Sequence, residues 1–117
     1  MNVSELLGEL QRAIDERAYF VRFDLLDQSE RILKARIYIS PNLFVQVYRN
    51  DQFDTSNFAL IHNGRRLHGR DQIAGRWHRH NTDQPQLHDT SLEGQQAVNL
   101  TEFLTEVESI LAALNLP

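Results

Sequence analysis

The histidines and several arginines of this chain gather in one stretch. All five histidines lie within 27 consecutive residues that also hold five arginines: His62, Arg65, Arg66, His68, Arg70, Arg76, His78, Arg79, His80 and His88. Residues 65–80 contain those five arginines and one acid, Asp71, whereas the other 101 residues contain seven Lys and Arg against fifteen Asp and Glu. Guanidinium and imidazolium groups suit anions. This Arg/His segment (residues 62–88) therefore predicts a site for a phosphate, a nucleic-acid backbone or an acidic protein partner.

Two histidines within the Arg/His segment, His78 and His80, are spaced for a shared ligand. Residues i and i+2 of an extended chain face the same side, so both imidazoles can meet one phosphate or one divalent ion. His88 and either Asp83 or Asp89 could complete a zinc, iron or manganese site. An H-x-H pair without a defined third ligand is more often a pair of surface histidines. No metal ligand or cofactor is predicted, and a metal-dependent hydrolase stays an alternative.

Acid-base chemistry without a metal is a second use of the same residues. One imidazole can remove the proton of a ribose 2'-hydroxyl, another can protonate the leaving oxygen, and a guanidinium can hold the phosphate, as RNA cleavage requires. The candidate catalytic residues are His78, His80, Arg70 and Asp71. The candidate ligand-binding residues are Arg65, Arg66, Arg76, Trp77, Arg79 and His88. The alternative of a different class is a non-catalytic module that binds an anion or a protein through the same groups.

The only tryptophan of the chain, Trp77, precedes His78 directly. An exposed indole can serve as a stacking platform for a nucleic-acid base. A single tryptophan is more often a hydrophobic anchor that holds its segment to the domain, and we favour that role for Trp77.

Length and composition describe one ordinary domain. A chain of 117 residues can bury a core of its own, so residues 1–117 are predicted to fold as a single unit. The chain has no cysteine, which excludes disulfides, thiolate zinc sites and thiol nucleophiles. No apolar run approaches the ~20 residues that span a bilayer, and residues 1–15 lack the regions of a signal peptide. We expect a cytoplasmic protein with no membrane partner.

Hydrophobic periodicity predicts an α+β domain. The expected elements are a helix over residues 4–16, strands over 18–25, 32–39 and 43–48, a hairpin of strands 58–62 and 65–68 around Asn63-Gly64, and a helix that begins near Thr101 and is capped by Asn99 or Thr101. Short turns favour an antiparallel meander sheet of four to five strands, packed on one face by the N- and C-terminal helices. Residues 69–96 show little periodicity and are expected to be irregular. The predicted core comprises Leu7, Leu10, Phe23, Ile37, Val45, Leu60, Phe103, Val107 and Leu111.

Aromatic side chains are also predicted on the sheet face that the helices leave uncovered. Tyr38, Phe44 and Tyr48 alternate there with polar neighbours. Exposed apolar patches of this kind are often covered by a partner. A homodimer is the simplest cover, and we expect one.

The order of elements and three short motifs resemble the small TumE-like toxins of bacterial toxin-antitoxin pairs. The motifs are Tyr48-Arg49, Arg70-Asp71-Gln72-Ile73-Ala74 and His78-Arg79-His80, followed by the helix near Thr101. Gln72 stands where that family favours asparagine. The resemblance implies a toxin that cleaves RNA and is neutralised by an antitoxin protein. RNA and an antitoxin are therefore the implied partners.

Overall fold

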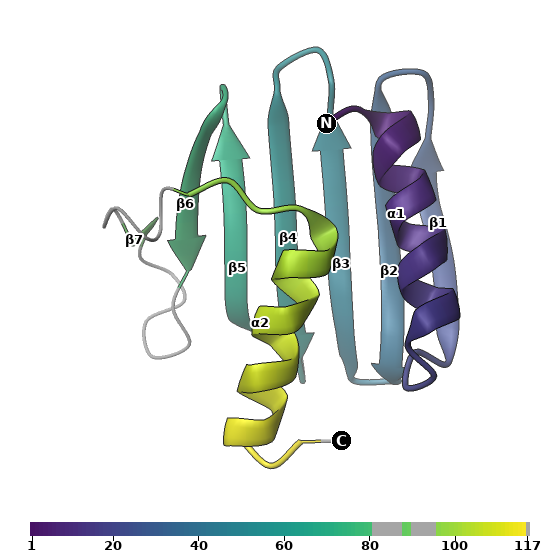
Figure 1. Ribbon diagram of the computed structural model, residues 1–117, viewed down its shortest axis with the longest axis vertical. Helices are drawn as coiled ribbons and strands as arrows, with labels where there is room; N and C mark the ends of the chain where they lie inside the picture. The colour runs from purple at the N-terminus through teal and green to yellow at the C-terminus, as the bar shows by residue number, and fades with distance from the viewer. Residues whose placement is uncertain (81–87, 90–95, 117) are drawn as a thin grey trace.

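The computed structural model describes residues 1–80, 88–89 and 96–116, and its elements are shown in Figure 1. Two helices, α1 (Val3–Glu16) and α2 (Leu100–Ala113), flank the strands in the sequence. The strands are β1 (Arg22–Gln28), β2 (Ile32–Ser40), β3 (Leu43–Asn50), β4 (Thr55–His62), β5 (Arg65–Ile73), β6 (Arg76–His80) and β7 (His88–Asp89). Within the described residues they form one sheet in chain order, with every neighbouring pair antiparallel. Both helices lie on the same face, which confirms the predicted α+β meander.

The sheet is wider than predicted because part of the segment expected to be irregular is a hairpin. β5 continues to Ile73, and β6 returns beside it after a two-residue turn at Ala74-Gly75. Both turn residues have positive φ, 50° for Ala74 and 81° for Gly75, as a tight hairpin turn with the twist of its strands requires. The four or five predicted strands are thus corrected to seven among the described residues, with β7 only two residues long.

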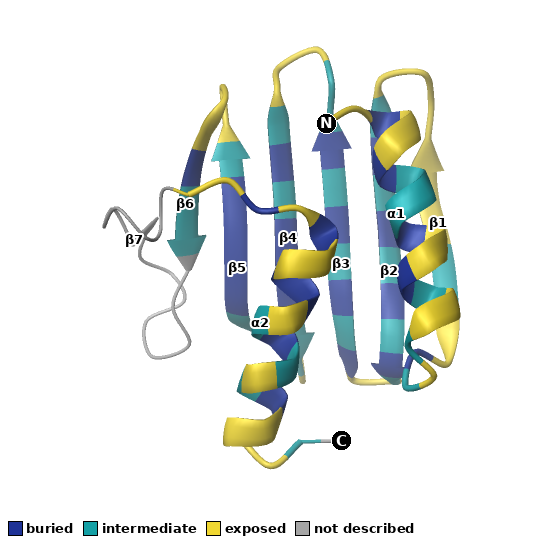
Figure 2. Ribbon diagram, viewed as in Figure 1, coloured by how far each residue is buried: buried dark blue, intermediate teal, exposed yellow. Residues whose placement is uncertain are grey.

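The core lies between the two helices and one face of the sheet. Alternate residues of β2 and β3 are fully buried there, and Figure 2 shows this alternation as bands along the strands. Seven of the nine predicted core residues are buried: Leu10, Ile37, Val45, Leu60, Phe103, Val107 and Leu111. The other two, Leu7 and Phe23, are partly buried and pack against this core.

Asparagine side chains begin both helices. The Asn2 side chain accepts a hydrogen bond from the Glu5 backbone N–H at 2.8 Å, so α1 begins one residue earlier than predicted. Asn99 and Glu102 form a reciprocal capping box with bonds of 2.7 and 2.9 Å, which confirms Asn99 as the cap of α2. Among the described residues, neither helix has the length and apolar character of a membrane span.

Replacing Phe58 with alanine should strongly destabilise the fold. Phe58 is fully buried at the centre of β4, and its ring centroid lies 5.6 Å from that of Phe103 and 6.0 Å from that of Trp77. The lost burial and the cavity left behind should lower the free energy of unfolding by about 3–5 kcal/mol in urea titrations followed by circular dichroism. The control Phe53→Ala, at a side chain 63% exposed, should change it by less than about 0.5 kcal/mol. Equal losses in both variants would contradict this account of the core.

Candidate functional site

The sheet divides the Arg/His segment between its two faces. Residues directly opposite each other on antiparallel strands share a face, and consecutive residues alternate. Phe58, Arg70 and Arg79 are partners across β4, β5 and β6, so all three belong to the face that the helices cover. The neighbouring row, Asp71 and His78, belongs to the face that the helices leave uncovered, which we call the open face. Arg70 and Asp71, both predicted to be catalytic, therefore point to opposite sides.

On the helix side, one carboxylate forms hydrogen bonds with two buried basic residues. Glu106 of α2 accepts hydrogen bonds from Arg70 Nε at 3.0 Å and Arg70 Nη2 at 2.6 Å, and its Oε1 lies 2.7 Å from His68 Nε2. His68 and Arg70 are 5% and 4% exposed, and the imidazole of His68 stacks on Phe103 with ring centroids 5.5 Å apart. Burial alone would raise the pKa of the Glu106 carboxyl, but the bonds from His68 and Arg70 outweigh it, and the pKa falls to about 2.

The position of Arg70 argues for a structural role. Its guanidinium is bound by a residue of α2, while His78 belongs to the opposite face of the sheet. The structure thus does not bring the predicted pair of Arg70 and His78 together. Glu106 was missed by sequence reasoning because it lies 36 residues from Arg70 in the chain, and no local pattern signals such a contact.

The arginine that shares a cavity with His78 is Arg76. A cavity of about 470 Å³ at β6 is lined, among the described residues, by Gly75, Arg76, Trp77, His78 and Ala97. Arg76 is exposed, and His78 is partly buried. We call this the β6 cavity. It holds a guanidinium and an imidazole together, which are the two groups that phosphate binding and proton transfer require.

Asp71 stands opposite His78 in the register and is well anchored. It is 8% exposed, it accepts a short hydrogen bond from the Asn57 side chain, and its Oδ2 lies 3.9 Å from Nη1 of Arg66. Cross-strand partners stand about 5 Å apart at their Cβ atoms. A carboxylate in that position stabilises an imidazolium, so Asp71 and His78 are suitable neighbours for acid-base chemistry.

The remaining predicted site residues are scattered. Arg65 is exposed at the start of β5, and Arg79 lies opposite Arg70. The backbones of His80 and His88 pair between β6 and β7, while their side chains lie outside the described part of the chain, as does Asp83. Among the residues that the structure describes, no group of three or more His, Asp or Glu side chains could hold a metal ion.

Trp77 is a core residue and not an exposed platform. It is 7% exposed, and its ring packs against Phe58 at a centroid distance of 6.0 Å. This confirms the predicted anchoring role. The same residue also lines the β6 cavity, so the anchor forms part of the candidate site.

The open face carries a row of aromatic and cationic side chains that sequence reasoning did not assign to the site. The guanidinium of Arg22 lies 5.2 Å from the ring centroid of Tyr38, and that of Arg36 lies 4.9 Å from Phe44. The ring centroids of Tyr38 and Phe44 are 5.0 Å apart. The sequence signal for this set is the alternation of aromatic and basic residues on β2 and β3. We call this set the aromatic row.

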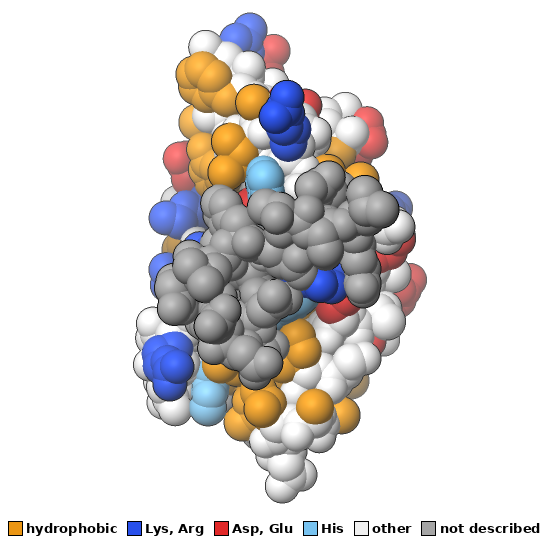
Figure 3. Space-filling model, turned by 90° about the vertical axis from the view of Figure 1, so that its left-hand side faces the viewer, with side chains coloured by type: hydrophobic (Ala, Val, Ile, Leu, Met, Phe, Trp, Pro, Cys, Tyr) orange, Lys and Arg blue, Asp and Glu red, His pale blue; other side chains and the backbone are white. Residues whose placement is uncertain are grey.

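Charge is segregated between strands and helices. Strands β2 to β6 contain eight Lys and Arg and a single acid, Asp71. Helices α1 and α2 contain seven Asp and Glu and a single base, Arg12. In the edge-on view of Figure 3, acidic side chains gather mainly on the side of the helices, and most basic side chains at the edges of the view lie on the other side. A net charge of -4 therefore coexists with a cationic sheet.

Comparison of the chain with family models, with curated proteins and with solved structures finds no match. Its function is therefore inferred from the geometry and charge of the described residues.

Replacing Glu106 with glutamine should destabilise the protein in a pH-dependent way. The pKa of Glu106 is about 2 in the folded protein against an ordinary value of 4.5, so its ionic bonds stabilise the fold above pH 4.5 and are lost as the pH falls toward 2. At pH 7 Glu106→Gln should lower the free energy of unfolding by about 1–3 kcal/mol. This difference in free energy between the variant and the wild type should become smaller as the pH falls from 4.5 to 2. Urea unfolding across this pH range measures both.

The control for this prediction is Glu16→Gln, whose side chain is 66% exposed at the end of α1. Its stability should follow that of the wild type at every pH. A gap for Glu106→Gln that stayed constant down to pH 2 would show that the variant acts through packing and not through ionisation.

Proposed function

We propose that this chain is a toxin of the toxin-antitoxin type that cleaves RNA, with the β6 cavity as its active site. The observation that carries the proposal is that Arg76 and His78 line one cavity. Arg76 would hold the scissile phosphate there. The resemblance of the motifs to TumE-like toxins supports the substrate class and the antitoxin partner.

The reaction would be attack of the ribose 2'-hydroxyl on the adjacent phosphorus. His78 removes the hydroxyl proton as the O2'–P bond forms, and the P–O5' bond breaks to leave a cyclic phosphate. The departing O5' takes up one proton, for which His80 is the candidate donor from the sequence. Asp71, opposite His78 in the register, would stabilise the imidazolium that forms, and Arg76 the charge on the phosphate.

The aromatic row would bind the rest of the RNA strand. Single-stranded RNA is commonly recognised on a sheet whose aromatic side chains stack on bases, with cations along the backbone. Tyr38, Phe44, Arg22 and Arg36 supply both kinds of group on the open face, the face to which His78 belongs. The positive charge of the strands would attract the phosphates of the RNA backbone.

Replacing His78 with alanine should abolish RNA cleavage and the growth arrest caused by expressing the chain alone. The fold should survive, because His78 lies near the sheet edge and is only partly buried. Arg76→Ala should lower the cleavage rate by about a hundredfold or more, since it removes a charged contact to the phosphate. The control His62→Ala changes a partly buried histidine at the far end of β4 and should cleave as the wild type does.

Cleavage is followed on a labelled single-stranded RNA, with and without a chelator. If the chelator abolished cleavage and one divalent ion restored it, the metal-dependent hydrolase would be the better account. If the wild type neither cleaved RNA nor slowed growth, the chain would be a non-catalytic binding module.

Replacing Phe44 with alanine should weaken RNA binding. Loss of one stacked base costs about 1–3 kcal/mol, which is roughly a five- to hundredfold rise in Kd measured by fluorescence anisotropy. The control Phe53→Ala removes an aromatic ring that is 63% exposed and lies outside the aromatic row, and should leave Kd unchanged. If Phe44→Ala changed the sedimentation behaviour and left Kd unchanged, the open face would be the predicted homodimer interface and not an RNA surface.

A further inference from the structure

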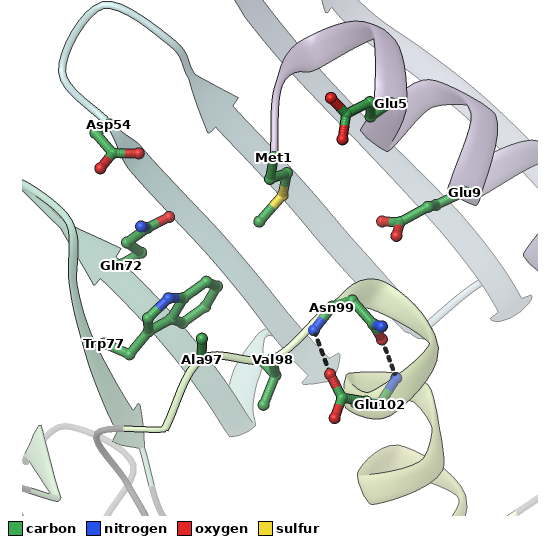
Figure 4. A pocket seen from close by; sticks show the side chains of 10 residues that line it. All are labelled: Met1, Glu5, Glu9, Asp54, Gln72, Trp77, Ala97, Val98, Asn99 and Glu102. Carbon is green, nitrogen blue, oxygen red and sulfur yellow. Dashed lines mark hydrogen bonds between the residues drawn. The ribbon is translucent and has the colours of Figure 1, made fainter.

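A second cavity lies on the helix side of the sheet, and its walls are acidic. It measures about 360 Å³ and lies where the N-terminal part of α1, the start of α2 and the hairpin of β5 and β6 meet (Figure 4). Four of its lining residues are Glu5, Glu9, Asp54 and Glu102, and Trp77 forms another wall. The described lining includes no Lys, Arg or His. We call it the acidic cavity.

One carboxylate oxygen of this cavity is shielded from solvent and also has no hydrogen-bond partner among the described residues. Oδ1 of Asp54 accepts a hydrogen bond from Arg49 at 2.8 Å, and Oε1 of Glu102 accepts one from the Asn99 backbone at 2.9 Å. Oε2 of Glu9, by contrast, is shielded from solvent and accepts no hydrogen bond from the described part of the chain. A buried carboxylate oxygen without a donor is costly, so a cationic donor at this position would relieve that cost.

Trp77 supplies a second, independent feature of a binding site. Its side chain is more than nine-tenths buried, at 7% exposure, and Figure 4 shows the indole projecting into the space between Gln72 and Ala97. An aromatic face beside carboxylates attracts organic cations, because the ring quadrupole and the negative charges act in the same direction.

We propose that the acidic cavity binds an organic cation, a guanidinium or alkylammonium group, between Trp77 and the carboxylate of Glu9. The acidic cavity shares Trp77 and Ala97 with the β6 cavity, but its carboxylates do not line the β6 cavity, and the proposal does not depend on RNA cleavage. The cation can come from a small diamine or guanidine, or from an arginine or lysine side chain of a protein partner. Both sources present the same chemistry to the cavity.

The experiment uses the intrinsic fluorescence of Trp77, which is the only tryptophan in the chain. Because Trp77 lines both cavities, the Glu9 variant is what assigns a change of emission to the acidic cavity. N-butylguanidinium should change the emission in a saturable way over the millimolar range. N-butylurea has the same shape without the charge and should not. Glu9→Gln should weaken binding of N-butylguanidinium by about tenfold or more, because a charged hydrogen bond is lost.

Glu16→Gln is the matched control, since it removes a carboxylate from the same helix at a side chain that is 66% exposed. It should bind N-butylguanidinium as the wild type does, and circular dichroism should show that both variants are folded. A blocked tripeptide with a central arginine separates the two sources. Binding tighter than that of N-butylguanidinium would point to a protein partner, and weaker binding to a free small cation.

Three results would overturn the proposal. The first is no saturable change of Trp77 emission with N-butylguanidinium. The second is equal binding of N-butylurea, which would make the cavity a neutral apolar site. The third is an unchanged affinity in folded Glu9→Gln.

Discussion

The hydrogen bonds of Glu106 to His68 and Arg70 link the helix layer of this fold to the sheet. β5 places His68 and Arg70 on the face that packs against the helices, where charged groups are costly unless they are paired. Glu106 of α2 meets both residues, so α2 must lie with that turn directly over β5. The start of α2 then follows beside β6, and that is the arrangement that closes the acidic cavity around Trp77. The alternation of β5 thus turns His68 and Arg70 toward α2, where Glu106 pairs with both, and turns Asp71 to the open face.

Most of the fold was predictable because its signals are local. The helices follow from apolar spacing, and the Asn63-Gly64 turn, with positive φ at both residues, identifies the hairpin of β4 and β5. β6 was not predicted, because four of its five residues are Arg or His and the strand therefore shows no alternation of apolar and polar residues. Its Ala74-Gly75 turn also lacks the usual asparagine or aspartate.

The missed strand explains why the site was only partly predictable. With residues 69–96 taken as irregular, Arg70 and Asp71 could both be assigned to one site with His78. A strand removes that freedom, because adjacent residues face opposite sides. Asp71 then joins His78 by register, whereas Arg70 joins Glu106. Arg76 and His78 instead line one cavity, a pairing that follows from the i, i+2 spacing once the strand is known.

The separation of charge resolves an apparent conflict between an acidic chain and an anionic ligand. Net charge governs association only when a ligand senses all the charges of the protein at once. At physiological salt, dissolved ions screen the interaction between exposed charges that are more than about 8 Å apart. The molecule is 23 Å across its shortest axis, with the core between the helices and the open face. The carboxylates of α1 and α2 are therefore screened from a ligand on the open face, which meets the cations of the strands. By the same reasoning, a cation that enters between the helices meets carboxylates and not the arginines of β5.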